Sequence, residues 1–325
     1  MKQNILPIQT QQDIPVLAID NSGKSEFDTC PFRGFIKQSL RLIPTTEDEH
    51  AINFGSGVHK GLETYYLTQD LQQAIQETYA YFEASPQVNI TDHRTPDRAV
   101  ELIRQHVEKY KYVDVTPAEV TGVNGTTALG VEIPFQKKLG EVTLQAPVLG
   151  FDREYLAGEV IQIHWTGMID IIYKENGRIA GIMDHKTTGS FYNFFSRYQE
   201  SGQFKGYLWA VNEILAEMDL SHDFVDKFTI NGLMLSKAGK MDLDRHTFRT
   251  TREKLQQWKE VTLEDVKGIV SMAEKGIWGR SGWKNCGFMY GRPCCYKDVC
   301  SSNQASYGVL LGSSAYKSYT WNPLN

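Results

Sequence analysis

The stretch from Gly167 to Thr188 constrains the fold of this chain more than any other part of the sequence. Two runs rich in β-branched residues meet there at Asn176 and Gly177, a pair typical of tight hairpin turns. We therefore predict a hairpin of two strands, over residues 167–174 and 178–187.

The predicted hairpin carries two carboxylates and one amine. Asp170 lies on the first strand, and Asp184 and Lys186 lie two residues apart on the second, so that these two share a face. Such groups are costly to bury unless they serve a purpose. A divalent cation that prefers oxygen ligands, such as Mg²⁺, binds carboxylates of this kind. A lysine beside it can orient a metal-activated water or neutralise charge on a phosphate.

The register of the hairpin decides whether these groups can meet. A two-residue loop would place Asp170 opposite Met183 and turn Asp184 to the other face. A three-residue loop over residues 176–178, or a β-bulge, would place Asp170 opposite Asp184. A metal site therefore predicts the three-residue or the bulged connection, and an ordinary hairpin with solvated charges is the alternative.

The 325-residue chain is long enough for one large domain or two modest ones, with 41% hydrophobic and 22% charged residues. Its net charge of −5 provides no overall basic field for nucleic acid, so any such contact must come from local patches. No apolar run is long enough to span a membrane, and residues 1–20 lack the pattern of a signal peptide. We therefore expect a cytoplasmic protein that does not bind membranes.

The periodicity of the sequence changes along the chain. A capping box at Ser25–Asp28 and helical spacing thereafter predict a helical N-terminal part, and a period of two then predicts an antiparallel meander. The expected helices are 53–69, 70–84, 96–113, 190–199, 203–219 and 251–276, and the expected strands are 127–137, 145–152, 159–165, 167–174, 178–187, 226–236 and 243–250. This order favours an α/β (α+β) fold with a helical lobe.

Four further polar residues are candidates for the same site. Glu132 lies on an upstream predicted strand and could supply another ligand or orient a water, or else be an exposed strand residue. His59 follows a glycine-rich turn that starts at Gly55, and it could be a nitrogen ligand, which Mn²⁺ accepts more readily than Mg²⁺. Gln203 and Tyr207 share a helix face and could hydrogen-bond a phosphate or a base, although an ordinary surface pair explains their spacing more simply.

The five cysteines form a more specific pattern, because four of them lie within residues 286–300. Three cysteines of that loop together with the distant Cys30, just before Pro31, would suit a Cys₄ zinc site or a [4Fe–4S] cluster. Either group would connect the two ends of the chain. Spacing alone does not decide between zinc and iron–sulfur.

Several other activities lack their motifs. The sequence contains no phosphate-binding loop and no dinucleotide fingerprint after a predicted strand, so an NTP-driven motor is not supported. The segment from His59 to Glu63 reads HKGLE and not HExxH, so a zinc protease is not supported either.

Taken in order, these motifs resemble the PD-(D/E)XK nucleases, and in particular the RecB-like exonuclease branch that carries an iron–sulfur cluster. The resemblance spans residues 30–300 and rests on six weak motifs in the right order. They are Cys30-Pro31, Gly55 to His59, Gly167 to Asp170, Asp184 to Thr187, Gln203 to Tyr207, and the three cysteines Cys286, Cys294 and Cys300. The family's fold implies a restriction-endonuclease-like mixed sheet flanked by helices.

The resemblance also implies a role for each residue. His59, Asp170, Asp184 and the backbone carbonyl of His185 would bind Mg²⁺ or Mn²⁺, and Glu132 could assist them. Lys186 would assist the attacking water, while Gln203 and Tyr207 would contact the DNA strand. Cys30, Cys286, Cys294 and Cys300 would ligate the cluster. The long spacing after Cys286 departs from the family pattern, and the neighbouring Cys295 leaves the choice of Cys294 open.

The implied organisation has five segments: an arm (1–24), a helical lobe (25–115), a nuclease core (116–276), a cysteine cap (277–302) closed by Cys30, and a tail (303–325). The substrate would be DNA, single-stranded or at duplex ends, in repair or recombination. A helicase or recombination partner would act in trans, because helicase motifs are missing, as in the stand-alone relatives of phages and of CRISPR adaptation. A non-catalytic DNA-binding scaffold and a site-specific endonuclease are the alternatives.

Two local features could guide a strand to this centre. Arg33, Lys37 and Arg41 form a basic stripe beside Cys30, although such a stripe is usually only a solvated face. Near the cysteines, bases could stack on three aromatic residues, whose simpler role is loop packing. These are Trp278, Trp283 and Tyr290.

Overall fold

The computed structural model describes residues 3–45, 50–85, 93–121, 127–218, 224–282, 286 and 293–320. The chain forms two compact units, each assembled from separated segments. The first comprises residues 1–47, 136–167 and 257–325, and the second comprises residues 48–135 and 168–256. The candidates for the predicted metal site all lie in the second unit, and all five cysteines lie in the first.

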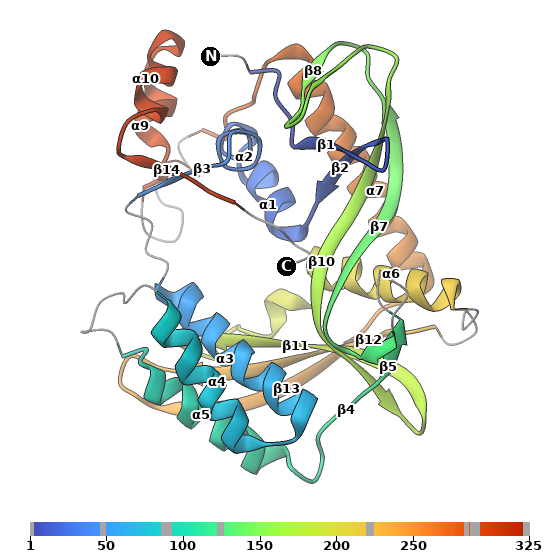
Figure 1. Ribbon diagram of the computed structural model, residues 1–325, viewed down its shortest axis with the longest axis vertical. Helices are drawn as coiled ribbons and strands as arrows, with labels where there is room; N and C mark the ends of the chain where they lie inside the picture. The colour runs from blue at the N-terminus through green and yellow to red at the C-terminus, as the bar shows by residue number, and fades with distance from the viewer. Residues whose placement is uncertain are drawn as a thin grey trace. The chain divides into compact units, whose positions relative to one another are not determined.

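A mixed sheet is the framework of the second unit (Figure 1). In spatial order its strands are β10 (Val160–Glu175), which begins in the first unit, β11 (Arg178–Thr188), β12 (Lys227–Leu235) and β13 (Met241–Arg249). β11 is antiparallel to β10 and parallel to β12, and β13 is antiparallel to β12. The sequence left the pairing of the last two strands open, and the crossover through α6 (Gly202–Glu217) makes the parallel β11–β12 pair possible.

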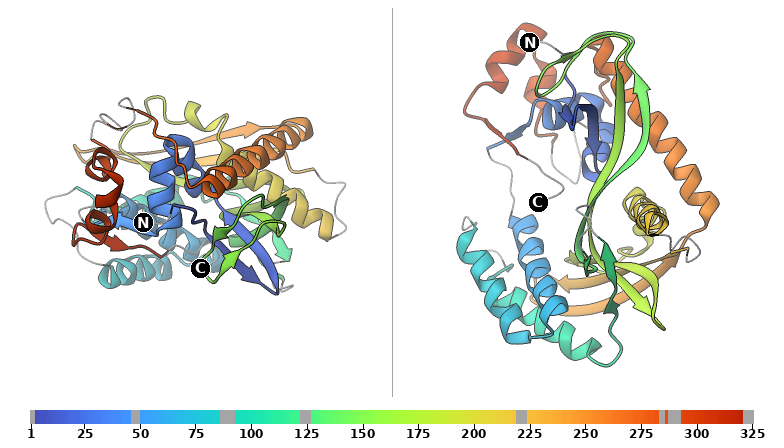
Figure 2. Two further views of the ribbon diagram at one scale, coloured as in Figure 1. Left: turned by 90° about the horizontal axis from the view of Figure 1, so that it is seen from above. Right: turned by 45° about the vertical axis from the view of Figure 1, so that its right-hand side comes forward.

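Helices cover both faces of this sheet. α3 (His50–Thr68), α4 (Leu71–Ala84) and α5 (Pro96–Tyr110) lie side by side (Figure 1, Figure 2) and share one apolar core with the strands. That core includes Leu233 of β12. On the same strand Phe228 stacks on Phe204 of α6, with ring centroids 4.7 Å apart. Because side chains alternate along a strand, positions 228 and 233 point to opposite faces, and the site lies on a sheet covered on both sides.

Gly130 holds the segment before Glu132 close to β10. The strands here are β4 (Thr116–Pro117), β5 (Glu119–Thr121), β6 (Thr127–Leu129) and β7 (Val131–Thr143), of which β4 and β7 pair with β10. Between β6 and β7, the Gly130 carbonyl accepts a hydrogen bond from the Ile172 N–H at 2.7 Å. A Cβ atom at Gly130 would lie only 2.7 Å from the Ile172 carbonyl oxygen, so this approach requires glycine.

In the first unit, strands β1 (Ile8–Gln11) and β2 (Ile14–Ile19) belong to the same sheet, and one long and several short helices accompany them. β1 pairs antiparallel with β2, and β2 is parallel to the first half of β10. The remaining elements are α1 (Asn21–Thr29), α2 (Pro31–Gly34), the π-helix η1 (Phe35–Ser39), β3 (Leu42–Pro44), β8 (Val148–Leu149), β9 (Glu154–Tyr155), α7 (Arg252–Lys275), α9 (Lys297–Ser301), the 3₁₀ helix η3 (Gln304–Ser306), α10 (Tyr307–Leu311) and β14 (Tyr316–Ser318).

The mixed α/β class and most predicted elements are confirmed, but four details are wrong. The two strands expected over 159–165 and 167–174 are one continuous strand, β10, and the strand expected over 145–152 is reduced to β8. Instead of a helix over 190–199 there is only the 3₁₀ turn η2 (Ser196–Tyr198), because Asn193 has a positive φ of 49°. The first helix starts at Asn21 and not at the capping box, since Asp20 accepts the Gly23 N–H at 2.6 Å.

None of the helices in the described part of the chain is both long enough and apolar enough to cross a membrane.

Candidate active site

The pairing register of the hairpin strands changes a short distance from the turn. Asn176 and Gly177 form a two-residue loop with φ values of 51° and 77°, the left-handed conformations that such a tight turn needs. Beyond the turn the register shifts, so that Tyr173 pairs with Gly181 and Ala180 is left as an extra residue. The connection is therefore a two-residue turn followed by a β-bulge.

The bulge brings the two aspartates into line. Ile171 pairs with Met183, so Asp170 and Asp184 come next in the register on the two strands. Both side chains are buried, at 6% and 3% exposure. The bulged connection that a metal site requires is thus present, and an ordinary hairpin with solvated charges is excluded.

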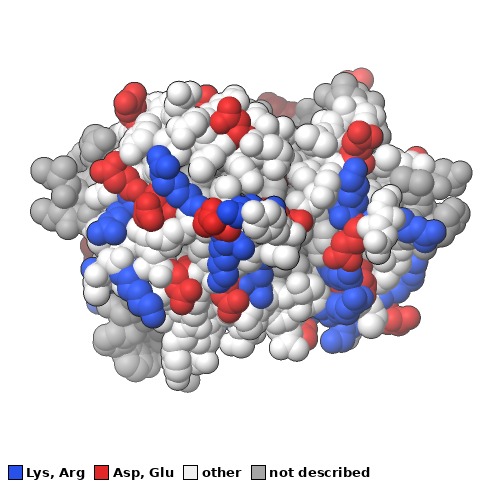
Figure 3. All heavy atoms as spheres, turned by 90° about the horizontal axis from the view of Figure 1, so that it is seen from below, with Lys and Arg blue, Asp and Glu red and all other residues white. Residues whose placement is uncertain are grey.

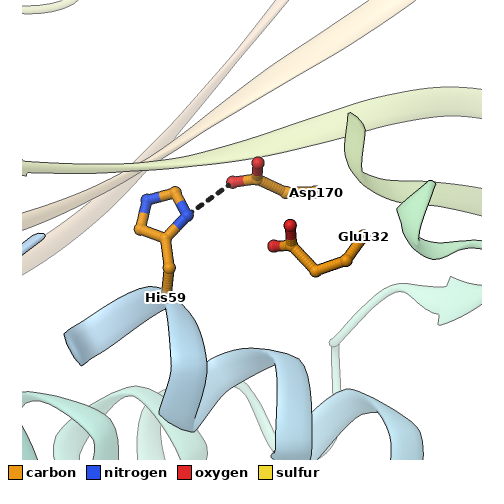
Figure 4. A group of neighbouring side chains, drawn as sticks. All are labelled: His59, Glu132 and Asp170. Carbon is orange, nitrogen blue, oxygen red and sulfur yellow. Dashed lines mark ion pairs between the residues drawn. The ribbon is translucent and has the colours of Figure 1, made fainter. Parts of the chain in front are cut away.

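Three side chains from separate elements converge on one point. His59 comes from α3, Glu132 from β7 and Asp170 from β10, and Figure 4 shows their polar atoms pointing toward one another. A possible ligand atom of each lies within 4.8 Å of those of the other two, and among the described residues no other group of three does this. An imidazole nitrogen with two carboxylate oxygens is a donor set that Mn²⁺ or Mg²⁺ accepts.

His59 and His185 hold this group against the sheet. The Nδ1 atom of His59 lies 3.3 Å from Oδ2 of Asp170, and its Nε2 atom lies 2.7 Å from the His185 carbonyl oxygen. The His185 N–H donates to the same Asp170 oxygen at 2.7 Å. The His185 carbonyl is therefore beside the other candidate ligands.

The glycines before His59 serve close packing and do not form a turn, because they lie within α3. A Cβ atom at Gly57 would lie 2.4 Å from the Phe82 ring, and one at Gly55 would lie 3.2 Å from Thr187 Oγ1. Small residues there let α3 approach both α4 and the end of β11. The glycine-rich turn predicted before His59 is therefore wrong, and these glycines pack helices instead.

Glu132 has an unusual backbone as well as an unusual environment. Its φ is 50°, the left-handed region that a residue with a side chain seldom adopts within a strand. Strain of this kind persists where the surroundings impose it and is common at functional sites. Burial, with the nearby charges of Asp170 and Glu63, raises the pKa of Glu132 to about 9. The metal-free site therefore holds a proton that a cation would displace.

Asp184 and Lys186 form an ion pair beside this group. Lys186 Nζ lies 2.7 Å from Asp184 Oδ2. Burial raises the pKa of Asp184 to about 6, against the opposing effect of Lys186. Burial disfavours the ammonium, but the two aspartates outweigh it and raise the pKa of Lys186 above its ordinary value. Lys186 is consequently a permanent cation.

Gln203 and Tyr207 are tied to the same carboxylate and are not a free surface pair. Gln203 lies in the first turn of α6, where the Ser201 side chain accepts its N–H. Its Nε2 donates to Asp184 Oδ1 at 3.5 Å and to the Tyr207 hydroxyl at 3.1 Å. Burial and then the Asp184 charge raise the pKa of Tyr207, so its phenol stays protonated and can donate.

The cysteines gather within the first unit. Cys30 caps the end of α1 and is buried, with Pro31 opening α2 directly after it. The Cys294 N–H donates to the Cys286 carbonyl at 2.8 Å. Burial raises the pKa of Cys300, and the charges of Cys286, Cys30 and Cys294 raise it further. Among the described residues, no three of these thiols lie within 4.8 Å of one another.

Cys294 and its neighbour Cys295 have different surroundings. Cys294 is half-buried, whereas Cys295 is exposed. A hydrogen bond from the Cys295 thiol lowers the pKa of Cys294 to about 6, against burial, and the Tyr296 N–H and the Arg33 charge contribute in the same direction. A thiol with a lowered pKa is a better metal ligand.

The basic stripe and the aromatic residues were expected to guide a DNA strand, but most of those described make ion pairs or pack within the protein. Lys37 Nζ lies 3.0 Å from Glu26, which also pairs with Arg33. Trp278 is 5% exposed and stacks on Phe35 at 5.0 Å, so it cannot stack on a base. Among the described residues of the face drawn in Figure 3, basic and acidic side chains are interspersed. Trp283 and Tyr290 lie outside the described residues.

Carboxylates, an imidazole and a protonated lysine on a mixed sheet form a centre of the kind used by metal-dependent hydrolases. The chain belongs to the PD-(D/E)XK nuclease superfamily, which it matches over residues 22–301. Among solved structures, a crystal structure of a candidate exonuclease from Eubacterium rectale matches 88% of this chain and 94% of its own, with 16% identity and a TM-score of 0.44. A search of curated proteins finds no match.

Proposed function

We propose that this nuclease is a metal-dependent DNA exonuclease of the RecB-like branch, which hydrolyses phosphodiester bonds from strand ends and prefers single strands. The observation that carries the proposal is the bulge, because it aligns Asp170 with Asp184 beside His59 and Glu132. A scaffold that only bound DNA would have no use for this costly arrangement of buried charges.

The donor set fits a hard divalent cation. His59, Glu132, Asp170, Asp184 and the His185 carbonyl would hold Mg²⁺ or Mn²⁺. A bound ion would lower the pKa of its water and neutralise charge on the phosphate. Lys186 does not act as the base, because its pKa is raised; it orients the attacking water and stabilises the negative charge that develops. Gln203 and Tyr207 would contact the strand, with the Tyr207 hydroxyl as the donor, because the Gln203 amide hydrogens bond to Asp184 and Tyr207.

Cys30, Cys286, Cys294 and Cys300 would ligate a [4Fe–4S] cluster, as the resemblance implies, with zinc as the alternative. The cluster would be structural, since every cysteine lies outside the unit that carries the acidic site. A cytoplasmic location and a helicase or recombination partner in trans are further proposals, which rest on the resemblance alone.

Whether cleavage requires a free DNA end can be tested directly. Purified protein with Mn²⁺ is incubated with end-labelled linear DNA, single-stranded and duplex, and with the same sequences as closed circles. We expect the linear forms to be degraded progressively, single strands fastest, while the circles stay intact. Cutting of closed circles would instead support the site-specific endonuclease, and binding without cleavage would support the scaffold.

The raised pKa of Glu132 predicts how pH affects stability without metal. Between its ordinary value of 4.5 and about 9, the folded chain holds a proton that the unfolded chain lacks. Stability from this group is therefore complete at low pH and is lost as the pH rises toward 9. Relative to Glu132→Gln, the wild type should lose at most about 1.4 kcal/mol of unfolding free energy per pH unit. Urea unfolding in EDTA measures this difference.

Saturating Mn²⁺ provides the control for that experiment. The ion binds the ionised carboxylate, so it should stabilise the wild type more at high pH and should stabilise Glu132→Gln less. Parallel pH profiles for the two proteins in EDTA would show that Glu132 is ionised in the metal-free site.

A further inference from the structure

A buried polar network lies behind the acidic site, and its centre is an asparagine on β12. Asn231 is fully buried, and its Oδ1 accepts a hydrogen bond from Arg245 Nε of β13 at 2.9 Å. Because arginine can only donate, this contact fixes the orientation of the amide. The Nδ2 atom therefore donates, to His185 Nδ1 at 2.7 Å and to His106 Nδ1 at 3.3 Å.

The amide thereby selects one tautomer for both imidazoles. A ring nitrogen that accepts a hydrogen bond carries no hydrogen, so neither imidazole is the doubly protonated cation. Each accepts at Nδ1 and carries its hydrogen on Nε2. His106 Nε2 then donates to the Tyr66 hydroxyl at 3.1 Å, and that hydroxyl donates to Asp114 at 2.9 Å.

Arg245 closes the network from the other side. One of its guanidinium nitrogens lies 2.8 Å from Asp114 Oδ1, and the guanidinium lies over the Tyr110 ring, 3.6 Å from its centroid. Burying an ion pair with two uncharged histidines is seldom more stable than apolar packing of the same volume. The network therefore calls for a role other than stability.

That role follows from where the network ends. The network holds the side chain of His185 by hydrogen bonds. The backbone N–H of His185 donates to Asp170, and its carbonyl lies within hydrogen-bond distance of the His59 ring. His185 also stacks on Tyr66, with ring centroids 5.6 Å apart and an interplanar angle of 22°. Tyr66 is seven residues after His59 on α3, two turns along the same face. One network thus fixes both the helix that carries His59 and the strand that carries the aspartate and the lysine.

We propose that Asn231 and Arg245 are positioning residues of this nuclease, which set the spacing between the His59–Asp170 side and the Asp184–Lys186 side of the metal site. They touch no substrate, and they act through His185 and Tyr66. The effect on cleavage rests on the proposed function, whereas the effect on metal binding does not.

The first test measures Mn²⁺ affinity and cleavage for Asn231→Leu, which keeps the branched shape of the side chain and removes its three hydrogen bonds. Loss of a group that orients a ligand typically weakens metal binding about 10–100-fold, and we expect this for both Mn²⁺ affinity and kcat. The matched control is Thr229→Val, two residues earlier on β12. Thr229 is also buried, and within the described part of the chain its hydroxyl contacts Thr247 and Tyr173. The control should remain within about twofold of the wild type, because its partners lie outside the network.

The second test needs neither metal nor activity. In metal-free protein with ¹⁵N-labelled histidine, the nitrogen shifts should show His106 and His185 as pure Nε2–H tautomers. In Asn231→Leu they should become tautomer mixtures, while Thr229→Val keeps the pure form. Asn231→Leu with a lower melting temperature but unchanged tautomers, Mn²⁺ affinity and kcat would reduce the network to a structural one. A wild type that binds Mn²⁺ tightly yet cleaves no DNA would refute the proposed nuclease activity and leave the positioning effect measurable by affinity.

Discussion

Replacing Lys186 with alanine is expected to reduce DNA cleavage by about 10³-fold while leaving Mn²⁺ binding intact. Loss of one preorganised group that stabilises charge in the transition state costs about 10²–10³ in kcat, and Lys186 also orients the attacking water in the proposed mechanism. Its ammonium lies 2.7 Å from Asp184 and is a permanent cation, so no other described side chain of the site supplies the same charge.

The same substitution separates stability from catalysis. Without Lys186 the buried Asp184 loses its ion-pair partner, which typically destabilises a protein by about 3 kcal/mol. Part of this loss is relieved because the pKa of Asp184, already about 6, rises further and the carboxyl takes up a proton. Mn²⁺ replaces the missing charge, so it should restore the melting temperature of Lys186→Ala but not its activity.

The matched control is Lys174→Ala, an exposed lysine of the same hairpin on β10. Cleavage rates under single-turnover conditions and melting curves with and without Mn²⁺ are measured for both variants. A Lys186→Ala protein that keeps more than a tenth of wild-type cleavage would rule out the role given to this lysine.

The sequence predicted the hairpin residues but could not choose its register. Period-two patterning is the same for a plain and a bulged hairpin, and the extra residue, Ala180, carries no signal of its own. A metal site requires Asp170 and Asp184 to lie side by side, and this requirement selected the register. A chemical requirement therefore predicted a backbone detail that propensity did not.

Residues whose role depends on distant neighbours were not predictable in the same way. Asn231 and Arg245 belong to ordinary strands in the sequence. The parallel β11–β12 pairing places Asn231 opposite His185, and the β12–β13 pairing places Arg245 opposite Asn231. Glu132 was a candidate from its charge, but its left-handed backbone follows from tertiary contacts. Trp278 failed as a base-stacking residue, because burial depends on the whole fold and not on the local sequence.

Replacing Cys300 with serine is expected to remove the bound cofactor and to loosen the first unit. Cys300 lies on α9, far along the chain from Cys30, so the proposed metal group would connect both ends of this unit. The closure of such a long loop is worth about 4–5 kcal/mol by analogy with a disulfide, which corresponds to a fall of about 10 °C in melting temperature. Visible spectra, iron and zinc contents and melting curves of protein purified without oxygen measure these effects.

The neighbouring cysteines provide the control and identify the fourth ligand. Cys294 is half-buried with a lowered pKa, whereas Cys295 is exposed, so Cys294→Ser should behave like Cys300→Ser and Cys295→Ser like the wild type. A brown wild type with about four irons would support the [4Fe–4S] cluster, and a colourless one with a single zinc would replace it with a Cys₄ zinc site. Retention of the metal by both Cys294→Ser and Cys300→Ser would rule out the ligand set itself, since the remaining thiols could not complete it.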